Sequence, residues 1–521
     1  MTYFHYEGNS VDKPDLPDFI IKNKEKFSNR NNKLTCLGYY RQDKDLHFFL
    51  PRVFEKTNTE DQVTKDVKKD LSIWLYSSIK RYRERKQTVI ANDIEGDLIS
   101  TSLDCNTNDM LLDHFLALEN FYYRNKDLIL LIYKESHRGY NRVNWAKTVR
   151  HCMPIISKKN GKVNVAYTEV FNEQQHIHDQ EDLMVFFFST LRYIQQEYNY
   201  PMPPNEYYTL MGAFEFKKMV DNQSACPRLR SIRQQYFDDR MLELWNLLYA
   251  FHNKLESNNT DNICAGNQNA EYLIATNFDR FFEDMIDYLI GDPKLEKLKG
   301  HEDNRIIDHI FLGKSLFGGA NSKVYYIADS KYYDPDHEIN GTSIAKQYDY
   351  ARNIIQMVRD HVNDEKTHDC IDMDVAKSYY DEITHGYNVT PNFFIRPSET
   401  EDGDFFHIHT KMENEVTIKT EPIFVFQHKG CLFDRSTLFL LHYDINLSYV
   451  LDVYSRENAG ERNTLRKKIE QTVREDLNNY INKEYFVKEN PNINIPLIAF
   501  TRPGILFGID NKLYMALSKS K

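Results

Sequence analysis

The sequence has 521 residues, of which 41% are hydrophobic and 27% charged, and this composition excludes a disordered or fibrous protein. At about 150 residues per domain, the length predicts two or three domains. No apolar run approaches the roughly 20 residues of a membrane span, and no secretory signal is visible, so we expect a cytoplasmic protein without membrane contact. The net charge of −11 argues against a surface that coats nucleic acid indiscriminately, although it permits local basic patches.

Apolar periodicity predicts both helices and strands in the N-terminal half. Helices are expected at residues 66–86, 110–123, 181–197 and 239–255, and a short buried strand at 128–133. Asn160-Gly161 predicts a β-hairpin of strands 152–157 and 162–167, because both residues accept positive φ. The basic run 80–86 is either a solvated helix end or a contact for nucleic acid or an acidic partner.

The polar, aperiodic residues 257–262 and 266–269 predict a connector and a domain boundary. We therefore expect an N-terminal α/β domain over residues 1–260 and a second domain over 265–521. In the tail, strand-like residues lie at 421–427 and 438–441, and a charged helix is expected at 462–480. The basic residues of that helix either line a DNA backbone groove or are simply solvated: Arg462, Arg466, Lys467, Lys468 and Arg474.

A helix expected at 278–289 carries the first candidate side chain. Its apolar residues form one stripe at helical spacing, and Glu283 projects from the flank of that stripe. Asp279 lies one turn earlier on the same flank and is an alternative to Glu283.

Two β-rich runs, 305–311 and 323–331, flank a pair of glycines and predict a hairpin. The first run contains Asp308. Because side chains two residues apart share a face of a strand, Asp329 and Lys331 are expected to point the same way. Paired carboxylates bind Mg²⁺, which polarises a phosphate, and a neighbouring lysine orients or deprotonates the attacking water. The alternative is a surface salt bridge at a strand end.

These residues resemble the PD-(D/E)XK nuclease superfamily. The matching positions are Glu283, Asp308 and the triplet Asp329-Ser330-Lys331, while Ile307 stands where the family name has proline. Similar triplets elsewhere, such as Glu215-Phe216-Lys217, lack an upstream strand aspartate. The resemblance implies Mg²⁺ or Mn²⁺ at Asp308, Asp329 and Glu283. It also implies support from Gln347, on a helix expected at 344–358, although a solvent-facing glutamine is equally compatible with the pattern.

A second resemblance covers roughly residues 126–355. Residues 142–148, with the sequence Arg-Val-Asn-Trp-Ala-Lys-Thr, and the following Pro154-Ile155-Ile156 resemble the central segment of LlaJI-type restriction endonucleases. Such proteins are similar to McrC, the nuclease subunit of restriction systems that work with a McrB-like GTPase. The resemblance implies a role in anti-phage defence and an AAA+ GTPase partner contacted through the N-terminal half. For Trp145 the alternative is a core aromatic side chain.

Other possible sites have weaker support in the sequence. His176 and His178, and likewise His407 and His409, would share a strand face, but further metal ligands are not evident, so surface histidines are favoured. Seven scattered cysteines without a Cys-x-x-Cys pair indicate reduced thiols. Gly313-Lys314-Ser315 lacks the upstream glycine of a phosphate-binding loop, so any nucleotide hydrolysis would come from a partner.

Together these patterns predict an α/β (α+β) protein. Its C-terminal domain is expected to be PD-(D/E)XK restriction-endonuclease-like, with a central mixed sheet flanked by helices. The predicted reaction is Mg²⁺-dependent hydrolysis of double-stranded DNA by Glu283, Asp308, Asp329, Lys331 and Gln347. An oligomeric assembly is compatible with these patterns. The alternative is a non-catalytic adaptor that binds DNA or an AAA+ partner through the same fold.

Overall fold

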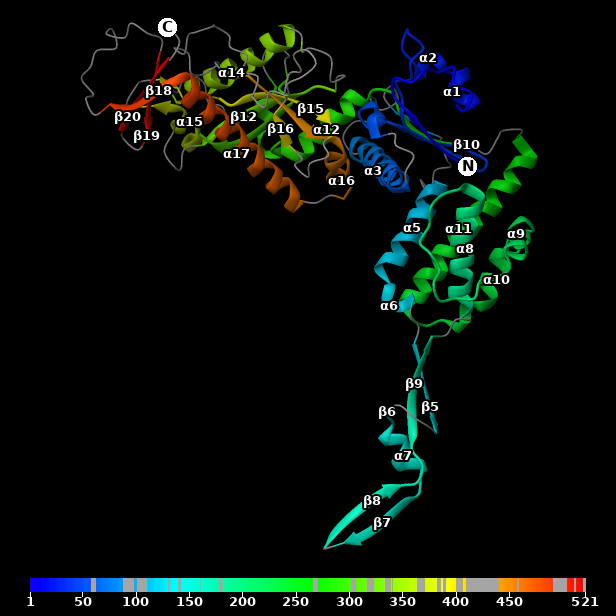
Figure 1. The fold of residues 1–521 in the computed structure, drawn as a ribbon. Coiled ribbons are helices and arrows are strands. Elements are labelled where there is room, and N and C mark those ends of the chain that lie inside the picture. Colours follow the sequence, from blue (N-terminus) through cyan, green and yellow to red (C-terminus); the bar gives the residue numbers. More distant parts are fainter. Residues whose placement is uncertain are drawn as a thin grey trace. The chain divides into compact units, whose positions relative to one another are not determined.

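The computed structural model describes most of the chain (Figure 1). The described residues are 1–57, 62–87, 98–100, 110–129, 132–138, 142–159, 161–177, 181–265, 270–300, 306–315, 323–332, 339, 341–362, 371–381, 386–387, 390–399, 406–408, 440–456, 459–490, 504–509 and 512–518. The strand-like residues 421–427, Asn160, His178 and His409 lie outside them.

The chain folds into two compact units whose segments alternate along the sequence. Unit 1 comprises Met1–Tyr3, Tyr40–His47 and Ser100–Tyr272; unit 2 comprises Phe4–Tyr39, Phe48–Ile99 and Leu273–Lys521. These units therefore do not coincide with the consecutive ranges 1–260 and 265–521. The boundaries between the two units all fall within the strands of one five-stranded sheet, whose order is β1-β3-β2-β10-β4. Its strands are β1 (Thr2–Tyr6), β2 (Leu37–Gln42), β3 (Asp45–Leu50), β4 (Leu98–Ser100) and β10 (Ala270–Ala275).

Unit 1 is built mainly of helices. They are α5 (Leu111–Arg124), α6 (Lys126–Ile129), α7 (Trp145–His151), α8 (Asp182–Tyr198), α9 (Ala213–Asp221), α10 (Ala225–Ile232), the 3₁₀ turn η2 (Arg233–Gln235) and α11 (Asp239–Ala265). Helix α8 begins where the Glu181 side chain accepts a bond from the Met184 backbone at 2.7 Å, and ends at Asn199, whose φ is 54°. Most of its side chains between these residues are buried.

The helix boundaries of unit 1 correct two predictions. The strand expected at 128–133 is wrong in its first half, because Leu128 lies in α6 and β5 (Ile132–Arg138) begins later. The connector expected at 257–262 is also wrong, since α11 continues to Ala265. Low helix propensity of Asn, Ser and Thr is a weak preference that neighbouring structure overrides.

The predicted hairpin of unit 1 is confirmed. β7 (Pro154–Lys159) pairs antiparallel with β8 (Lys162–Tyr167), with Lys159 opposite Lys162, and Gly161 in the turn has φ of 75°. A second antiparallel sheet has the order β5-β9-β6, with β9 (Phe171–Ile177) and β6 (Arg142–Val143).

Unit 2 contains the remaining elements. Its helices are α1 (Asp18–Lys22), α2 (Lys24–Phe27), η1 (Arg52–Thr57), α3 (Gln62–Gln87), α12 (Phe278–Ile290), η3 (Pro293–Leu295), α13 (Glu296–Lys299), α14 (Gly341–Val362), α15 (Met373–Tyr379), α16 (Leu447–Arg456) and α17 (Ala459–Glu484). Its further strands are β11 (His309–Lys314), β12 (Lys323–Ser330), β13 (Tyr380–Asp381), β14 (Gly386–Tyr387), β15 (Asn392–Ser398), β16 (Phe406–Ile408), β17 (Leu441–Asn446), β18 (Tyr485–Asn490), β19 (Gly504–Ile509) and β20 (Lys512–Ser518).

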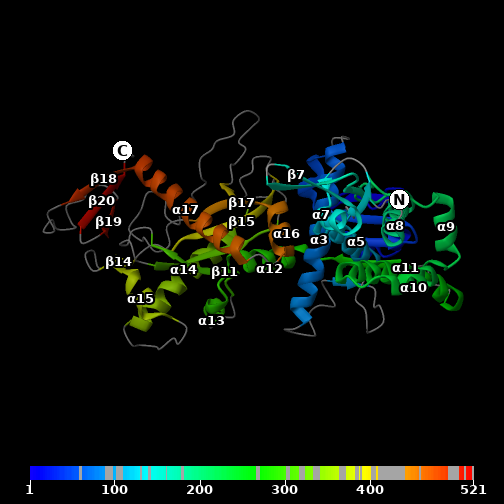
Figure 2. The same cartoon turned by 90° about the horizontal axis from the view of Figure 1, so that it is seen from below.

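A mixed five-stranded sheet of order β11-β12-β15-β17-β16 forms the centre of unit 2. β12 pairs antiparallel with β11 and parallel with β15, and β15 pairs parallel with β17. Helices α12 and α14 both contact β12, and α12 also contacts α16 and α17 (Figure 2). The expected α/β class, with a mixed sheet and flanking helices, is confirmed, whereas the PD-(D/E)XK arrangement stays a prediction. Within the described part of the chain, no helix has the length and apolarity needed to span a bilayer.

Candidate active site

The candidate site lies at one end of the β11–β12 ladder. Residues Val324–Ala328 are fully or almost fully buried, which explains why this apolar run forms a central strand. His309 pairs with Ala328 in the antiparallel register, so the next pair along would be Asp308 and Asp329. Directly after β12, the backbone N–H of Lys331 donates to the carbonyl of Ile395 in β15 at 2.8 Å, so the pairing with β15 extends to Lys331.

The carboxyl groups of Asp308 and Asp329 lie close enough to affect each other's protonation. Burial, a hydrogen bond with Asp329 and the negative charges of Asp329 and Glu283 raise the pKa of Asp308 well above its usual range, and Lys331 partly opposes this shift. Lys331 Nζ lies 2.5 Å from Asp329 Oδ1. Asp329 is only 5% exposed, so this ion pair does not lie on the surface, and a purely structural salt bridge stays the alternative to a metal site.

Glu283 reaches this group from α12. The predicted apolar stripe of the helix is buried, including Phe278, Phe282 and Ile286. Glu283 influences the Asp308 carboxyl, as the raised pKa of Asp308 indicates. For Asp279, burial raises the carboxyl pKa and the charge of Lys331 opposes the rise, so the two groups are within electrostatic range of each other. Two of the acidic residues of α12, Asp279 and Glu283, are therefore within electrostatic range of members of the candidate site.

Gln347 is buried rather than solvent-facing. Its exposed fraction is 0%, and among the described residues its side-chain oxygen and nitrogen have no hydrogen-bond partner. Its backbone carbonyl accepts a bond from Asn392 Nδ2 at 2.8 Å, which ties α14 to β15. The solvent-facing alternative is wrong, and support of the site by Gln347 stays a prediction.

Two further residues beside the site, Tyr332 and Glu7, could not be recognised from the sequence pattern. Tyr332 directly follows Lys331, and its hydroxyl donates to Glu7 Oε2 at 2.6 Å. The rings of Phe278 and Phe282 lie 4.8 and 5.9 Å from the Tyr332 ring. A contact between residues so distant in the chain leaves no local pattern that a single sequence could reveal.

Some of the basic residues considered for nucleic-acid contact instead make packing contacts within unit 2. In α3, Arg81 is buried and stacks over the rings of Tyr288 and Tyr454, while Tyr82 stacks on Phe281. The interpretation of this run as a solvated helix end is therefore wrong for Arg81 and Tyr82.

Two arginines of the charged helix α17 have a comparable internal role. Arg462 and Arg466 both donate to the Gly291 carbonyl at the C-terminus of α12. Cations at this end of a helix interact favourably with its dipole. These two side chains consequently hold α12 against α17.

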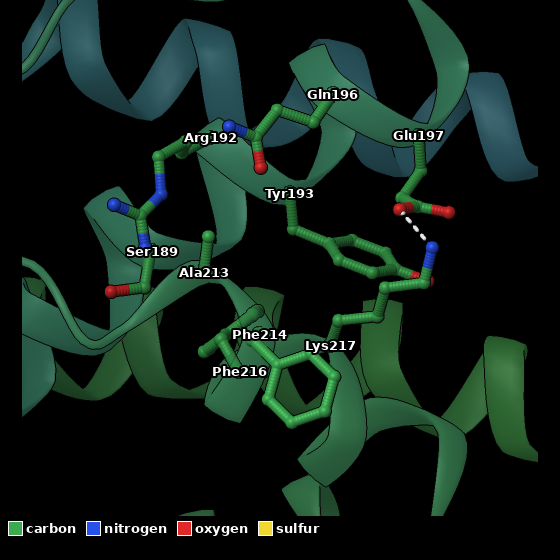
Figure 3. Close-up of a pocket in the computed structure, with 9 residues that line it drawn as sticks. All are labelled: Ser189, Arg192, Tyr193, Gln196, Glu197, Ala213, Phe214, Phe216 and Lys217. Atoms are coloured by element: carbon green, nitrogen blue, oxygen red, sulfur yellow. Dashed lines mark hydrogen bonds and ion pairs between the residues drawn. The ribbon is translucent and has the colours of Figure 1, made fainter.

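A cavity of about 150 Å³ lies in unit 1, and none of its lining residues is a predicted site residue (Figure 3). It is lined by residues of α8 and α9, including Arg192, Gln196, Glu197, Phe214 and Lys217. The Glu197 carboxylate bonds Lys217 Nζ at 2.5 Å. An ion pair therefore forms part of the cavity wall, and the cavity shares no residue with the carboxylate group of unit 2.

The donor set around Asp308 fits a hard divalent cation. Within the residues that the structure describes, no three His, Cys, Asp or Glu side chains converge as a ready metal site. Mg²⁺ is commonly held by one or two carboxylates together with waters and substrate phosphates, so it does not need a third protein ligand. Asp308 and Asp329 supply two such neighbouring carboxylates.

Comparison with known proteins gives only distant matches. No family model and no curated protein matches the chain. Among solved structures, one match is a half-complex from a tetradecameric assembly of Thermococcus gammatolerans McrB AAA+ hexamers with bound McrC: identity is 11%, the TM-score 0.29, and 92% of this chain and 100% of that chain are covered. Another is the McrBC complex of the same organism, with 10% identity, a TM-score of 0.18, and coverage of 57% and 90%. Both scores are too low to establish a shared fold.

Proposed function

We propose that this chain is a metal-dependent DNA endonuclease of the PD-(D/E)XK type. The observation that carries the proposal is the proximity of the Asp308 and Asp329 carboxyls, with Lys331 Nζ 2.5 Å from Asp329 Oδ1. Two neighbouring carboxyls, one of which has a raised pKa, are suited to exchange a proton for Mg²⁺ or Mn²⁺. The mixed sheet with helices on it supports the same proposal.

Each residue has a distinct role in this reaction. Asp308 and Asp329 would hold the cation, and Glu283 would complete its surroundings or orient the attacking water. A bound Mg²⁺ supplies Lewis-acid polarisation of the scissile phosphate. Lys331 orients the attacking water and offsets the negative charge that develops on the phosphate.

The proposal includes double-stranded DNA as substrate and a McrB-like AAA+ GTPase as partner, by resemblance of residues 142–156 to LlaJI-type and McrC-like proteins. Exposed apolar side chains in this part of unit 1 support a protein partner. Trp145 is 60% exposed, so its interpretation as a core aromatic is wrong. Further large apolar side chains are exposed close by in the sequence: Val149, Met153, Ile155, Ile156, Val163 and Val165. A role in anti-phage restriction follows from this resemblance.

Cleavage of plasmid DNA by the purified chain tests the proposal. The arms are wild type, Lys331→Ala and the matched control Lys323→Ala, which removes an exposed lysine at the other end of β12. Each is assayed with Mg²⁺, with Mn²⁺ and with chelator, alone and with the GTPase partner and GTP. We expect metal-dependent cutting by wild type and Lys323→Ala, and a loss of about 100-fold or more in Lys331→Ala.

Two outcomes would contradict the proposal. Equal cutting by wild type and Lys331→Ala would show that the carboxylate–lysine group is not the active site. If no protein cuts even with the partner, while Asp329→Ala retains full biological activity, the chain is an adaptor rather than an enzyme.

A further inference from the structure

A second ionic group, formed by the half-buried Asp287 with two buried partners, lies one helical turn beyond Glu283. Asp287 is four residues after Glu283 on α12, so the two side chains project from the same side of the helix. Asp287 Oδ1 accepts a bond from Lys299 Nζ at 2.8 Å and lies 3.3 Å from His309 Nδ1. His309 is completely buried and Lys299 is 6% exposed. This group therefore joins α12 to the first residue of β11.

His309 is the residue that directly follows Asp308. Two backbone bonds hold the chain on either side of this pair: Ile307 N–H donates to the Lys299 carbonyl at 2.9 Å, and Asp292 N–H donates to the Ile310 carbonyl at 2.9 Å. Both partners belong to the segment that follows α12. The position of Asp308 relative to α12 is consequently set by one side-chain group and two backbone bonds.

We propose that Asp287 is a positioning residue that sets the spacing between the Glu283 and Asp308 carboxylates through its contacts with His309 and Lys299. The inference rests on the proposed function, because the spacing matters only if the two carboxylates act on a common cation. Functional groups must be held within about 0.5 Å of their productive positions, and residues behind metal ligands commonly supply that precision.

The chemistry of the contact defines the informative substitutions. An ionised carboxylate only accepts hydrogen bonds, so Nδ1 of His309 carries the proton in its contact with Asp287. Asn at position 309 retains a side-chain N–H donor at a similar distance from the backbone, whereas Ala retains none. His309→Asn should therefore preserve the contact that His309→Ala removes.

Asp284 supplies a matched control on the same helix. Its carboxylate pairs with Arg85 at 2.8 Å and accepts a bond from the Tyr454 hydroxyl at 2.7 Å, so it ties α12 to α3 and α16. Asp284→Ala removes an ionic contact of α12 without touching the chain around Asp308. A general loosening of the helix would affect the Asp284 and Asp287 variants alike.

The experiment measures Mn²⁺ binding to the full chain by electron paramagnetic resonance of free Mn²⁺, together with the urea midpoint of unfolding. We expect Asp287→Ala and His309→Ala to raise the Mn²⁺ dissociation constant about 10- to 100-fold. Asp284→Ala and His309→Asn should keep the wild-type constant, although Asp284→Ala lowers the urea midpoint. If Asp287→Ala does not fold, the comparison of His309→Ala with His309→Asn decides.

Failure of the inference differs from failure of the proposed function. Wild-type affinity in both Asp287→Ala and His309→Ala would overturn the positioning role and leave the nuclease proposal intact. Equal loss of affinity in the Asp284 and Asp287 variants would also overturn it. A wild-type chain that binds no Mn²⁺ would overturn both.

Discussion

The Tyr332 hydroxyl donates to Glu7 Oε2 at 2.6 Å across 325 residues of sequence. Tyr332 is also the residue that follows Lys331, so the N-terminal segment of unit 2 is bonded directly to the end of β12 that carries the candidate site. The rings of Phe278 and Phe282 in α12 pack beside the Tyr332 ring. A residue near the start of the chain therefore belongs to the immediate environment of the candidate nuclease site.

Tyr332→Phe removes the hydroxyl and leaves the Glu7 carboxyl without this donor. The free energy of unfolding should fall by about 1 kcal/mol, as is usual for one lost hydrogen bond. Urea denaturation followed by circular dichroism measures the change. Tyr3→Phe is the control, because the Tyr3 hydroxyl has only an exposed contact with the Met1 sulfur at 3.7 Å. An equal effect in both variants would show that the Glu7 contact adds nothing to stability.

Glu7 also predicts a pH dependence of stability. Burial raises the pKa of the Glu7 carboxyl from 4.5 to about 7, although hydrogen bonds from Tyr332 and the Arg52 backbone oppose the rise. Between these pH values the folded state binds the proton more tightly than the unfolded state, so stability falls as pH rises through this window. Glu7→Gln stays neutral and should lack this loss. Urea midpoints from pH 4 to 8 should diverge between the two proteins; parallel curves would refute the assignment.

Gly291→Ala tests the close packing at the end of α12. A β-carbon at this position would clash with Asp287 Oδ1 and lie 2.6 Å from the Asp287 carbonyl oxygen. Overpacking of this kind should lower the free energy of unfolding by about 1–3 kcal/mol. Gly300→Ala is the matched control, since nothing lies within 4 Å of its β-carbon position. Thermal denaturation of both variants makes the comparison, and an unchanged melting temperature in Gly291→Ala would contradict the packing argument.

Gln347→Leu should separate stability from activity. The buried amide has no hydrogen-bond partner among the described residues, so replacing it with an apolar side chain should raise the free energy of unfolding by about 1 kcal/mol. If Gln347 supports the nuclease site, DNA cleavage should fall at the same time. Gln356→Leu, on the exposed side of the same helix, should change neither quantity markedly. A destabilised Gln347→Leu protein would mean that the amide has partners beyond the described residues.

The elements that the sequence predicted well are those specified by local patterns. The apolar stripe of α12 and the Asn-Gly hairpin each depend on residues within a few positions of one another, and both form as expected. The opposition of Asp308 and Asp329 was also accessible, because it follows from two strands around a glycine turn. Their metal binding stays a prediction.

Other features depend on partners far away in the chain and could not be read from local patterns. The basic run of α3 has the composition of a solvated helix end, yet Arg81 is buried against aromatic rings from two distant helices. Trp145 is a large aromatic residue of the kind common in protein cores, yet most of its surface is exposed. The hydrophobicity of a residue therefore predicted the wrong burial for both side chains, because burial also depends on which distant residues pack against each position.

The interleaving of the two units has a consequence for synthesis on the ribosome. Ser78 of α3 donates to the Leu451 carbonyl of α16, 373 residues later. At about 5–20 residues per second, roughly 20 to 75 seconds pass between translation of these two residues. During that interval Leu71, Leu75 and Ile79, which are buried in the finished fold, have not yet met α16. The nascent N-terminal segment of unit 2 therefore exposes the face of α3 that later packs on α16 until Leu451 has been translated.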